Sequence, residues 1–148
     1  MIDSSIPRTE CKDPGAKPGA KPGAKPGAKK VFVVDDNRDE CGELAEYIRH
    51  KGHFVTEIHD GITAITEIQA HKPELVLMDV HMPFCDGIRA TELAQSLSPR
   101  TTIVLMSGYP EEVVRAKRAT FGALKVLAKP LSLKKVARVV AAVLDRQT

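Results

Sequence analysis

Five short apolar segments recur from residue 30 onward, and each is followed by a longer amphipathic segment. The apolar segments are rich in β-branched residues, and we expect strands at 31–34, 53–58, 75–79, 101–106 and 124–128. The amphipathic segments predict helices at 38–51, 61–71, 87–97, 111–120 and 132–145. Short apolar strands are typical of a sheet that is buried on both faces. Strict alternation with right-handed crossovers predicts an α/β domain, with a five-stranded parallel sheet and helices on both faces.

Turn and capping residues mark several of these boundaries. Gly52 follows the first predicted helix and is a typical helix stop, and Pro73 ends the second. Ser132 is a candidate cap for the last helix. These signals support the predicted element ends.

Residues 1–29 have a different composition from the rest of the chain. The sequence Pro-Gly-Ala-Lys occurs four times between Pro14 and Lys29, without a large apolar residue. Such a segment cannot offset the entropy of ordering itself. We expect a disordered tail at 1–29 that acts as a solvated tether, and a folded domain at 30–148. An alternative is that the evenly spaced lysines contact an anionic surface.

Charge and cysteine content exclude several classes of protein. The net charge is +3, but residues 1–30 carry +4 and residues 31–148 carry −1, which argues against general nucleic-acid binding by the domain. The three cysteines (Cys11, Cys41 and Cys85) form no Cys-x-x-Cys pair, so a reduced, cytoplasmic protein is expected. The sequence has no apolar run of 18 residues and no signal-peptide core, so no membrane span is expected.

Chemically active side chains stand at the carboxyl ends of four predicted strands. They are Asp35 and Asp36, then Asp79, then Ser107, then Lys129. Carboxyl ends of parallel strands meet at one edge of the sheet, which is where open α/β sheets bind ligands. Clustered carboxylates need a cation, and a small set of oxygen ligands favours Mg²⁺. A carboxylate can also attack phosphorus, and a lysine and a hydroxyl can stabilise the transferred group.

These motifs together resemble the receiver domain of bacterial two-component response regulators, over about residues 30–148. The motifs are Val-Val-Asp35-Asp36, Leu-Met-Asp79-Val-His-Met-Pro83 with Asp86-Gly87, Leu-Met-Ser107-Gly108 and Ala-Lys129-Pro130. Each motif is weak alone, but their order and their spacing at strand ends are specific. The resemblance implies a flavodoxin-like (βα)5 fold with strand order 2-1-3-4-5.

The resemblance also assigns a metal site and a phosphorylation site. Asp79 matches the phosphorylated aspartate. Asp36 matches a direct Mg²⁺ ligand, and Asp35 an acid that acts through water. The backbone carbonyl of His81 matches the third protein ligand.

Two further residues match groups that contact the phosphoryl group in the family. Ser107 matches the hydroxyl that moves toward it. Lys129 matches the lysine that pairs with it, and the resemblance implies a cis bond to Pro130. Gly87 is expected to serve a turn or a helix start.

The switch region departs from the family pattern. The family often has Phe or Tyr three residues before the lysine, whereas this chain has Val126. Tyr109, two residues after Ser107, is the candidate substitute. His81, two residues after Asp79, stands at a position that influences dephosphorylation and kinase fit in the family.

The resemblance implies a signalling module rather than an enzyme with a separate substrate. A histidine kinase or a histidine phosphotransfer protein is the expected donor to Asp79, and an unknown protein receives the output. The domain is expected to catalyse its own phosphorylation and dephosphorylation. Both a stand-alone receiver and a receiver from a hybrid kinase fit the sequence.

Other interpretations remain open at this point. An aspartate-nucleophile phosphatase usually has Asp-x-Asp, whereas this chain has Asp79-Val80-His81. A pseudo-receiver that only binds partners would not need the complete set of acids. Considered singly, Asp36 could be a helix cap. Cys85 lacks the partners of a catalytic nucleophile.

Overall fold

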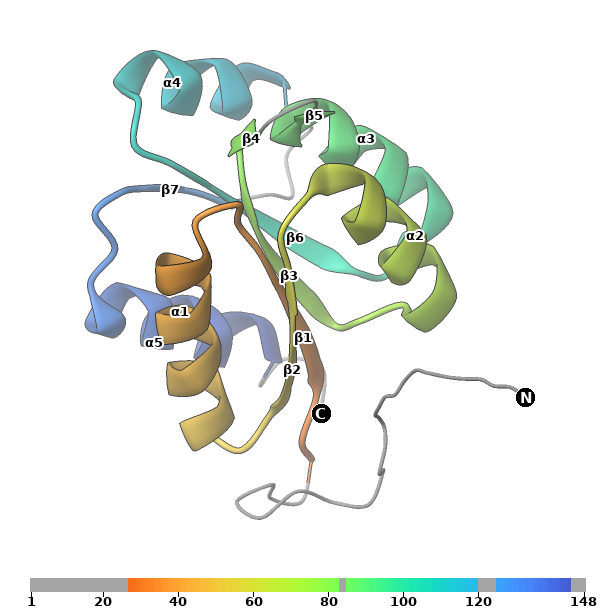
Figure 1. Cartoon of the computed structure of the whole chain (residues 1–148), viewed down its shortest axis with the longest axis vertical. Coiled ribbons are helices and arrows are strands. Elements are labelled where there is room, and N and C mark those ends of the chain that lie inside the picture. Colours follow the sequence, from red (N-terminus) through yellow and green to blue (C-terminus); the bar gives the residue numbers. More distant parts are fainter. Residues whose placement is uncertain (1–26, 83–84, 120–124, 145–148) are drawn as a thin grey trace.

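The computed structural model describes residues 27–82, 85–119 and 125–144 (Figure 1). Most of the predicted tail, residues 1–26, lies outside these ranges, as does the side chain of Cys85. The described residues form one parallel sheet covered by helices. No helix within the described ranges has both the length and the apolar character that crossing a membrane requires.

A five-stranded sheet forms the centre of the domain. Its strands are β1 (Lys30–Val34), β2 (Phe54–Ile58), β3 (Leu75–Asp79), β6 (Thr102–Ser107) and β7 (Lys125–Ala128). They lie in the order β2-β1-β3-β6-β7, and every neighbouring pair is parallel. Numbered within this sheet alone, the order is the predicted 2-1-3-4-5. The parallel α/β fold is therefore confirmed.

Helices cover both faces of the sheet, as predicted (Figure 1). The helices are α1 (Arg38–His50), α2 (Gly61–His71), α3 (Gly87–Leu97), α4 (Pro110–Ala119) and α5 (Leu133–Leu144). The buried residues of α1 and α5 join one hydrophobic cluster, and those of α2 and α3 join a second. The two clusters lie on opposite faces of the sheet.

Alternate residues of the central strands supply the two clusters. Val31 and Val33 pack on the α1/α5 face, whereas Phe32 and Val34 pack on the α2/α3 face. All five residues of β3 are buried. This two-sided burial explains why the strands have no polar face in the sequence.

Local signals define the helix ends. The first cap is Asn37 and not Asp36, because the Asn37 side chain accepts hydrogen bonds from the backbone nitrogens of Asp39 and Glu40. Gly52 has φ of +97°, the left-handed conformation expected of a helix stop. The hydroxyl of Ser132 accepts from the Lys135 nitrogen at 3.1 Å, which confirms the predicted cap of α5.

A small antiparallel ribbon occupies the predicted loop after β3. It pairs β4 (His81–Met82) with β5 (Cys85–Asp86), and α3 begins directly afterwards at Gly87. A Cβ on Gly87 would clash with the carbonyl oxygen of Asp79 and would lie 2.7 Å from the Val80 Cα. Glycine at this position therefore lets the helix start approach the end of β3.

Candidate functional site

Three carboxylates converge at the carboxyl edge of the sheet. Asp35 and Asp36 follow β1, and Asp79 ends the neighbouring strand β3. One oxygen from each residue lies within 4.8 Å of the others. Asp35 is fully buried and Asp79 is 6% exposed, whereas Asp36 faces solvent. The structure thus brings together the three acids that the sequence predicted, with one side open.

Lys129 supplies the positive charge next to these acids. Its Nζ atom lies 3.0 Å from Asp35 Oδ2 and 3.2 Å from Asp79 Oδ2. Glu40 on α1 also contacts this lysine, with its Oε1 atom 2.9 Å from Nζ. Burial lowers the pKa of Lys129, but the hydrogen bonds to Glu40 and Asp35 outweigh burial and raise it above its ordinary value. The lysine is therefore charged, and three acids share it.

The carboxyl group of Asp79 is held by both of its oxygens. Oδ1 accepts from the His81 backbone nitrogen at 3.1 Å, while Oδ2 contacts Lys129. Burial raises the pKa of Asp79 to about 6. The His81 hydrogen bond and the Lys129 charge oppose that increase, and the charge of Asp35 adds to it. A cation at the site would restore the ionised form.

Ser107 lies at the end of β6, next to Asp79 in the sheet, since the register pairs Asp79 with Met106. Its hydroxyl donates to Glu112 Oε1 at 3.0 Å and accepts from the Tyr109 backbone nitrogen at 3.1 Å. Glu112 also contacts the ring of His81, with 3.3 Å between Oε2 and Nδ1. The hydroxyl is therefore bound by a carboxylate of α4.

Neither Glu40 nor Glu112 was predicted as part of the site. Both lie in the first turns of helices that follow site strands. Exposed glutamates near a helix start are common, because they complement the helix dipole. Their position in the sequence, shortly after strands that carry site residues, was the one signal for including them.

The two candidate switch residues lie in different surroundings. Tyr109 is 51% exposed, and its ring centroid lies 5.2 Å from that of His81 at an interplanar angle of 54°. Val126 is partly buried and packs against the α2/α3 cluster. Tyr109 is therefore a surface group. Val126 instead contributes to the packing on the sheet face that α2 and α3 cover.

The donor set of the acid cluster fits a hard divalent cation. Carboxylate oxygens on one open side suit Mg²⁺, which keeps several water ligands. The bond between Lys129 and Pro130 is cis, as the resemblance implied. The His81 carbonyl as a ligand stays a prediction.

Fold and site together define a doubly wound α/β domain with an acidic centre and a lysine at its switch-point edge. The family model for the response regulator receiver domain matches residues 31–141. The chain therefore belongs to the response regulator receiver domain family.

Similar proteins agree with this assignment. The chemotaxis protein CheY of Treponema pallidum (strain Nichols) is 32% identical over 118 residues, which cover 78% of this chain and 82% of the relative. The transcriptional regulatory protein PdtaR of Mycobacterium tuberculosis (strain CDC 1551 / Oshkosh) is 34% identical, and the match covers 71% of this chain but 51% of that protein. The chain thus spans about half of that longer relative.

A solved structure with a modified aspartate is also similar. It is a response regulator protein from Burkholderia pseudomallei with a phosphorylated aspartic acid, a calcium ion and citrate. It is 29% identical with a TM-score of 0.67, and the match covers 78% of this chain and 66% of that one.

Proposed function

We propose that Asp79 accepts a phosphoryl group from a phosphohistidine of a histidine kinase or a histidine phosphotransfer protein. The observation that carries this proposal is the position of its carboxylate. It lies at the switch-point edge, 3.2 Å from Lys129 Nζ and within 4.8 Å of the Asp35 and Asp36 carboxylate oxygens. The phosphorylated aspartate of the similar Burkholderia structure supports it.

In this reaction a carboxylate oxygen of Asp79 attacks phosphorus, and an acyl phosphate forms. The bond between phosphorus and the histidine nitrogen breaks, and its electron pair stays on the imidazole. Mg²⁺ held by Asp35, Asp36 and Asp79, and by the His81 carbonyl, would supply positive charge for the phosphoryl oxygens. Lys129 already contacts Asp79 Oδ2 and would stabilise the same phosphoryl oxygens.

Ser107 is the second group that would stabilise the phosphoryl oxygens. Its hydroxyl would exchange Glu112 for a phosphoryl oxygen. Water attack on the acyl phosphate later returns the carboxylate and free phosphate. The domain therefore catalyses its own phosphorylation and dephosphorylation and has no separate substrate to turn over.

We expect the phosphorylated domain to pass its signal on through a partner-binding surface in the cytoplasm. Phosphorylation would bias two arrangements of the surface near α4, through Ser107 and its neighbours. Tyr109 is the proposed surface group, because it follows Ser107 by two residues and is half exposed. The downstream partner is a protein, either separate or joined in one chain with this domain.

The test uses beryllofluoride, which mimics the phosphoryl group on a carboxylate. With Mg²⁺ it should shift the amide resonances near Asp79, Ser107 and Lys129 in the wild-type protein. Asp79→Asn should abolish these shifts, whereas the matched control Asp39→Asn, an exposed acid on α1, should retain them. Equal shifts in Asp79→Asn would overturn the proposal.

Tyrosine fluorescence tests the surface readout separately. The chain has no Trp, and Tyr47 is the one other tyrosine. Tyr47→Phe therefore isolates the signal of Tyr109. The emission should change on addition of beryllofluoride and Mg²⁺, and an unchanged emission would remove Tyr109 as a switch.

A further inference from the structure

A second group of metal-ligating side chains lies between α1 and β2. Cys41 is on the buried face of α1, Glu57 is in β2, and His59 follows β2 directly. Sγ of Cys41, one carboxylate oxygen of Glu57 and one ring nitrogen of His59 all lie within 4.8 Å of one another. Glu57 and His59 are two residues apart, so an extended strand directs both to the same face. None of these three residues belongs to the Asp79 site.

The spacing can be compared with that of a tetrahedral metal centre. Metal–ligand bonds of about 2.0–2.3 Å in a tetrahedron place the ligand atoms roughly 3.3–3.8 Å apart. The three ligand atoms here lie within 4.8 Å of one another, so side-chain rotations would have to close the cluster around an ion. Three protein ligands leave a fourth position for water.

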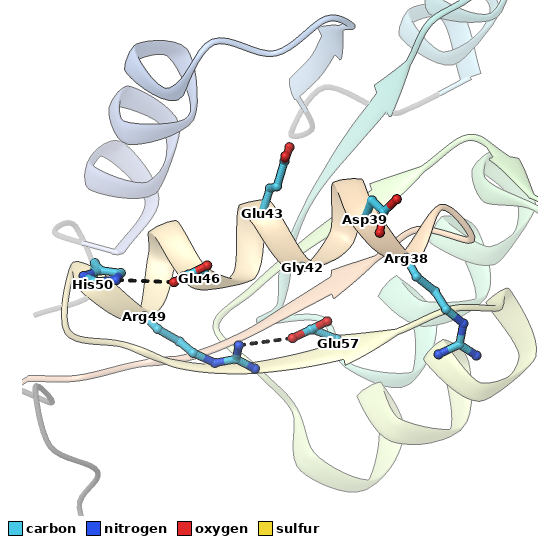
Figure 2. A pocket seen from close by; sticks show the side chains of 8 residues that line it. All are labelled: Arg38, Asp39, Gly42, Glu43, Glu46, Arg49, His50 and Glu57. Carbon is cyan, nitrogen blue, oxygen red and sulfur yellow. Dashed lines mark hydrogen bonds and ion pairs between the residues drawn. The ribbon is translucent and has the colours of Figure 1, made fainter.

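Glu57 is oriented in the way that carboxylate ligands usually are. Its Oε2 atom accepts from Arg49 Nη1 at 3.1 Å (Figure 2). Arg49 is itself anchored through Nη2 to the Val55 carbonyl at 3.0 Å. The other oxygen, Oε1, faces Gly42, where an added Cβ would lie 3.8 Å away. Arg49 thus fixes one oxygen, and the second is available to an ion.

His59 has the backbone contact that accompanies metal-binding histidines. Its Nδ1 atom lies 3.1 Å from the carbonyl oxygen of Asp35. In the tautomer with its proton on Nδ1, the ring would donate to that carbonyl and would keep the lone pair of Nε2 for a metal ion. The thiol of Cys41 meanwhile donates to the Val33 carbonyl at 3.3 Å. Both side chains are therefore held at the end of β1.

A cleft exposes one member of this group, Glu57, to solvent. It has a volume of about 870 Å³, and Gly42 and Glu57 are among its lining residues (Figure 2). Asp39, Glu43 and Glu46 also line it, beside Arg38, Arg49 and His50. The acids at this cleft would attract a cation, and the absence of a side chain at Gly42 leaves Glu57 accessible from it.

We propose that Cys41, Glu57 and His59 form a second metal site, for a borderline-soft divalent cation of the Zn²⁺ class. Thiolate and imidazole ligands select such ions over Mg²⁺, which prefers oxygen. The two sites therefore take different metals, although Asp35 contributes a carboxylate to one and a carbonyl contact to the other.

Binding at this site displaces the thiol proton. Burial raises the pKa of Cys41 to about 11, and the nearby charges of Glu57 and Asp35 add to the increase. A divalent cation opposes both effects, so the thiol loses one proton to solvent as the metal–sulfur bond forms.

Co²⁺ is the probe, because a thiolate bound to it gives a charge-transfer absorption. The protein is the full chain without a histidine tag, carrying Cys11→Ser and Cys85→Ser so that Cys41 is the one cysteine. Excess Mg²⁺ occupies oxygen sites during the titration. We expect the charge-transfer band to saturate at one equivalent of Co²⁺ and to disappear when Zn²⁺ is added.

Variants test each ligand. Cys41→Ala should abolish the band, and Glu57→Gln and His59→Asn should each weaken Co²⁺ binding by about tenfold or more. Glu46→Gln and His50→Asn are matched controls, since both line the cleft but lie outside the cluster. They should leave the titration unchanged.

Two results would overturn the proposal. One is the absence of the band in the parent protein that contains Cys41. The other is unchanged binding in both Glu57→Gln and His59→Asn, which remain informative even if Cys41→Ala fails to fold.

Discussion

Lys129 Nζ lies closer to Glu40 Oε1 (2.9 Å) than to Asp79 Oδ2 (3.2 Å). Glu40 therefore competes for the lysine that the phosphoryl group needs, and it adds a negative charge near an anionic ligand. Glu40→Gln should bind beryllofluoride with Mg²⁺ a few-fold more tightly than the wild type, as measured by titration. Its effect on the free energy of unfolding should stay below about 1 kcal/mol, because the pair is partly exposed.

Glu43→Gln is the control for that experiment. It removes an exposed carboxylate from the same helix, three residues after Glu40. Its beryllofluoride affinity should match that of the wild type. Weaker binding by Glu40→Gln would mean that Glu40 positions Lys129 instead of competing for it.

Asp79 should destabilise the metal-free fold at neutral pH. Its pKa is about 6 in the fold against an ordinary value of 3.8, so the fold favours the protonated carboxyl. The stabilisation that the protonated carboxyl gives to the fold is complete below about pH 4 and is lost as the pH rises through 6. Asp79→Asn, which stays neutral, should be more stable than the wild type by about 2–3 kcal/mol at pH 7.5.

Urea denaturation in EDTA at several pH values measures this difference. The advantage of Asp79→Asn should shrink toward zero near pH 4, where the wild-type carboxyl is also neutral. Glu92→Gln, an exposed acid on α3, should show no such pH dependence. A constant difference between Asp79→Asn and wild type across this range would contradict the raised pKa.

The sequence predicted the position of the site better than its contacts. The structure brings Asp35, Asp79 and Lys129 together, as expected, because each ends or follows a buried strand and parallel strands bring their carboxyl ends to one edge. The alternation of burial in β1 and β3 likewise follows directly from their apolar runs. These features depend on the direction and order of the strands, which the alternation of apolar and amphipathic segments predicts.

Contacts made by long side chains could not be predicted in this way. Glu40 and Glu112 resemble solvated residues at helix starts, and tertiary packing alone brings them to Lys129 and Ser107. Asn37 and Asp36 are both good caps by residue type, so the choice between them depended on backbone geometry. The β4–β5 ribbon has two residues in each strand, too few for a periodic signal.

Glu112 should restrain Ser107 in the unphosphorylated protein. The Ser107 hydroxyl donates to a carboxylate, a stronger acceptor than an amide, so the hydrogen bond must be broken before it can reach a phosphoryl oxygen. Glu112→Gln should therefore tighten binding of beryllofluoride with Mg²⁺ by about fivefold, which corresponds to about 1 kcal/mol. Titration followed by amide resonances measures the affinity.

A double-mutant cycle identifies the route of that effect. In a Ser107→Ala background, Glu112→Gln should give little further gain, because the hydrogen bond is already absent. Glu111→Gln, which changes the neighbouring exposed acid, should bind beryllofluoride like the wild type. The same gain with and without the serine hydroxyl would show that the charge of Glu112 acts directly.

Gly87 should be far less tolerant of a side chain than Gly42. A Cβ on Gly87 would clash with the Asp79 carbonyl oxygen and lie 2.7 Å from Val80 Cα, and these are backbone atoms that cannot rotate away. Gly87→Ala should lower the free energy of unfolding by about 1–3 kcal/mol and shift the amide resonances of Asp79. In Gly42→Ala the nearest atom is Glu57 Oε1 at 3.8 Å, an ordinary contact, so alanine should stabilise α1 by about 0.5–1 kcal/mol. Urea denaturation of both variants in EDTA checks the opposite signs. Equal stability of Gly87→Ala and wild type would show that α3 can begin without this close approach to β3.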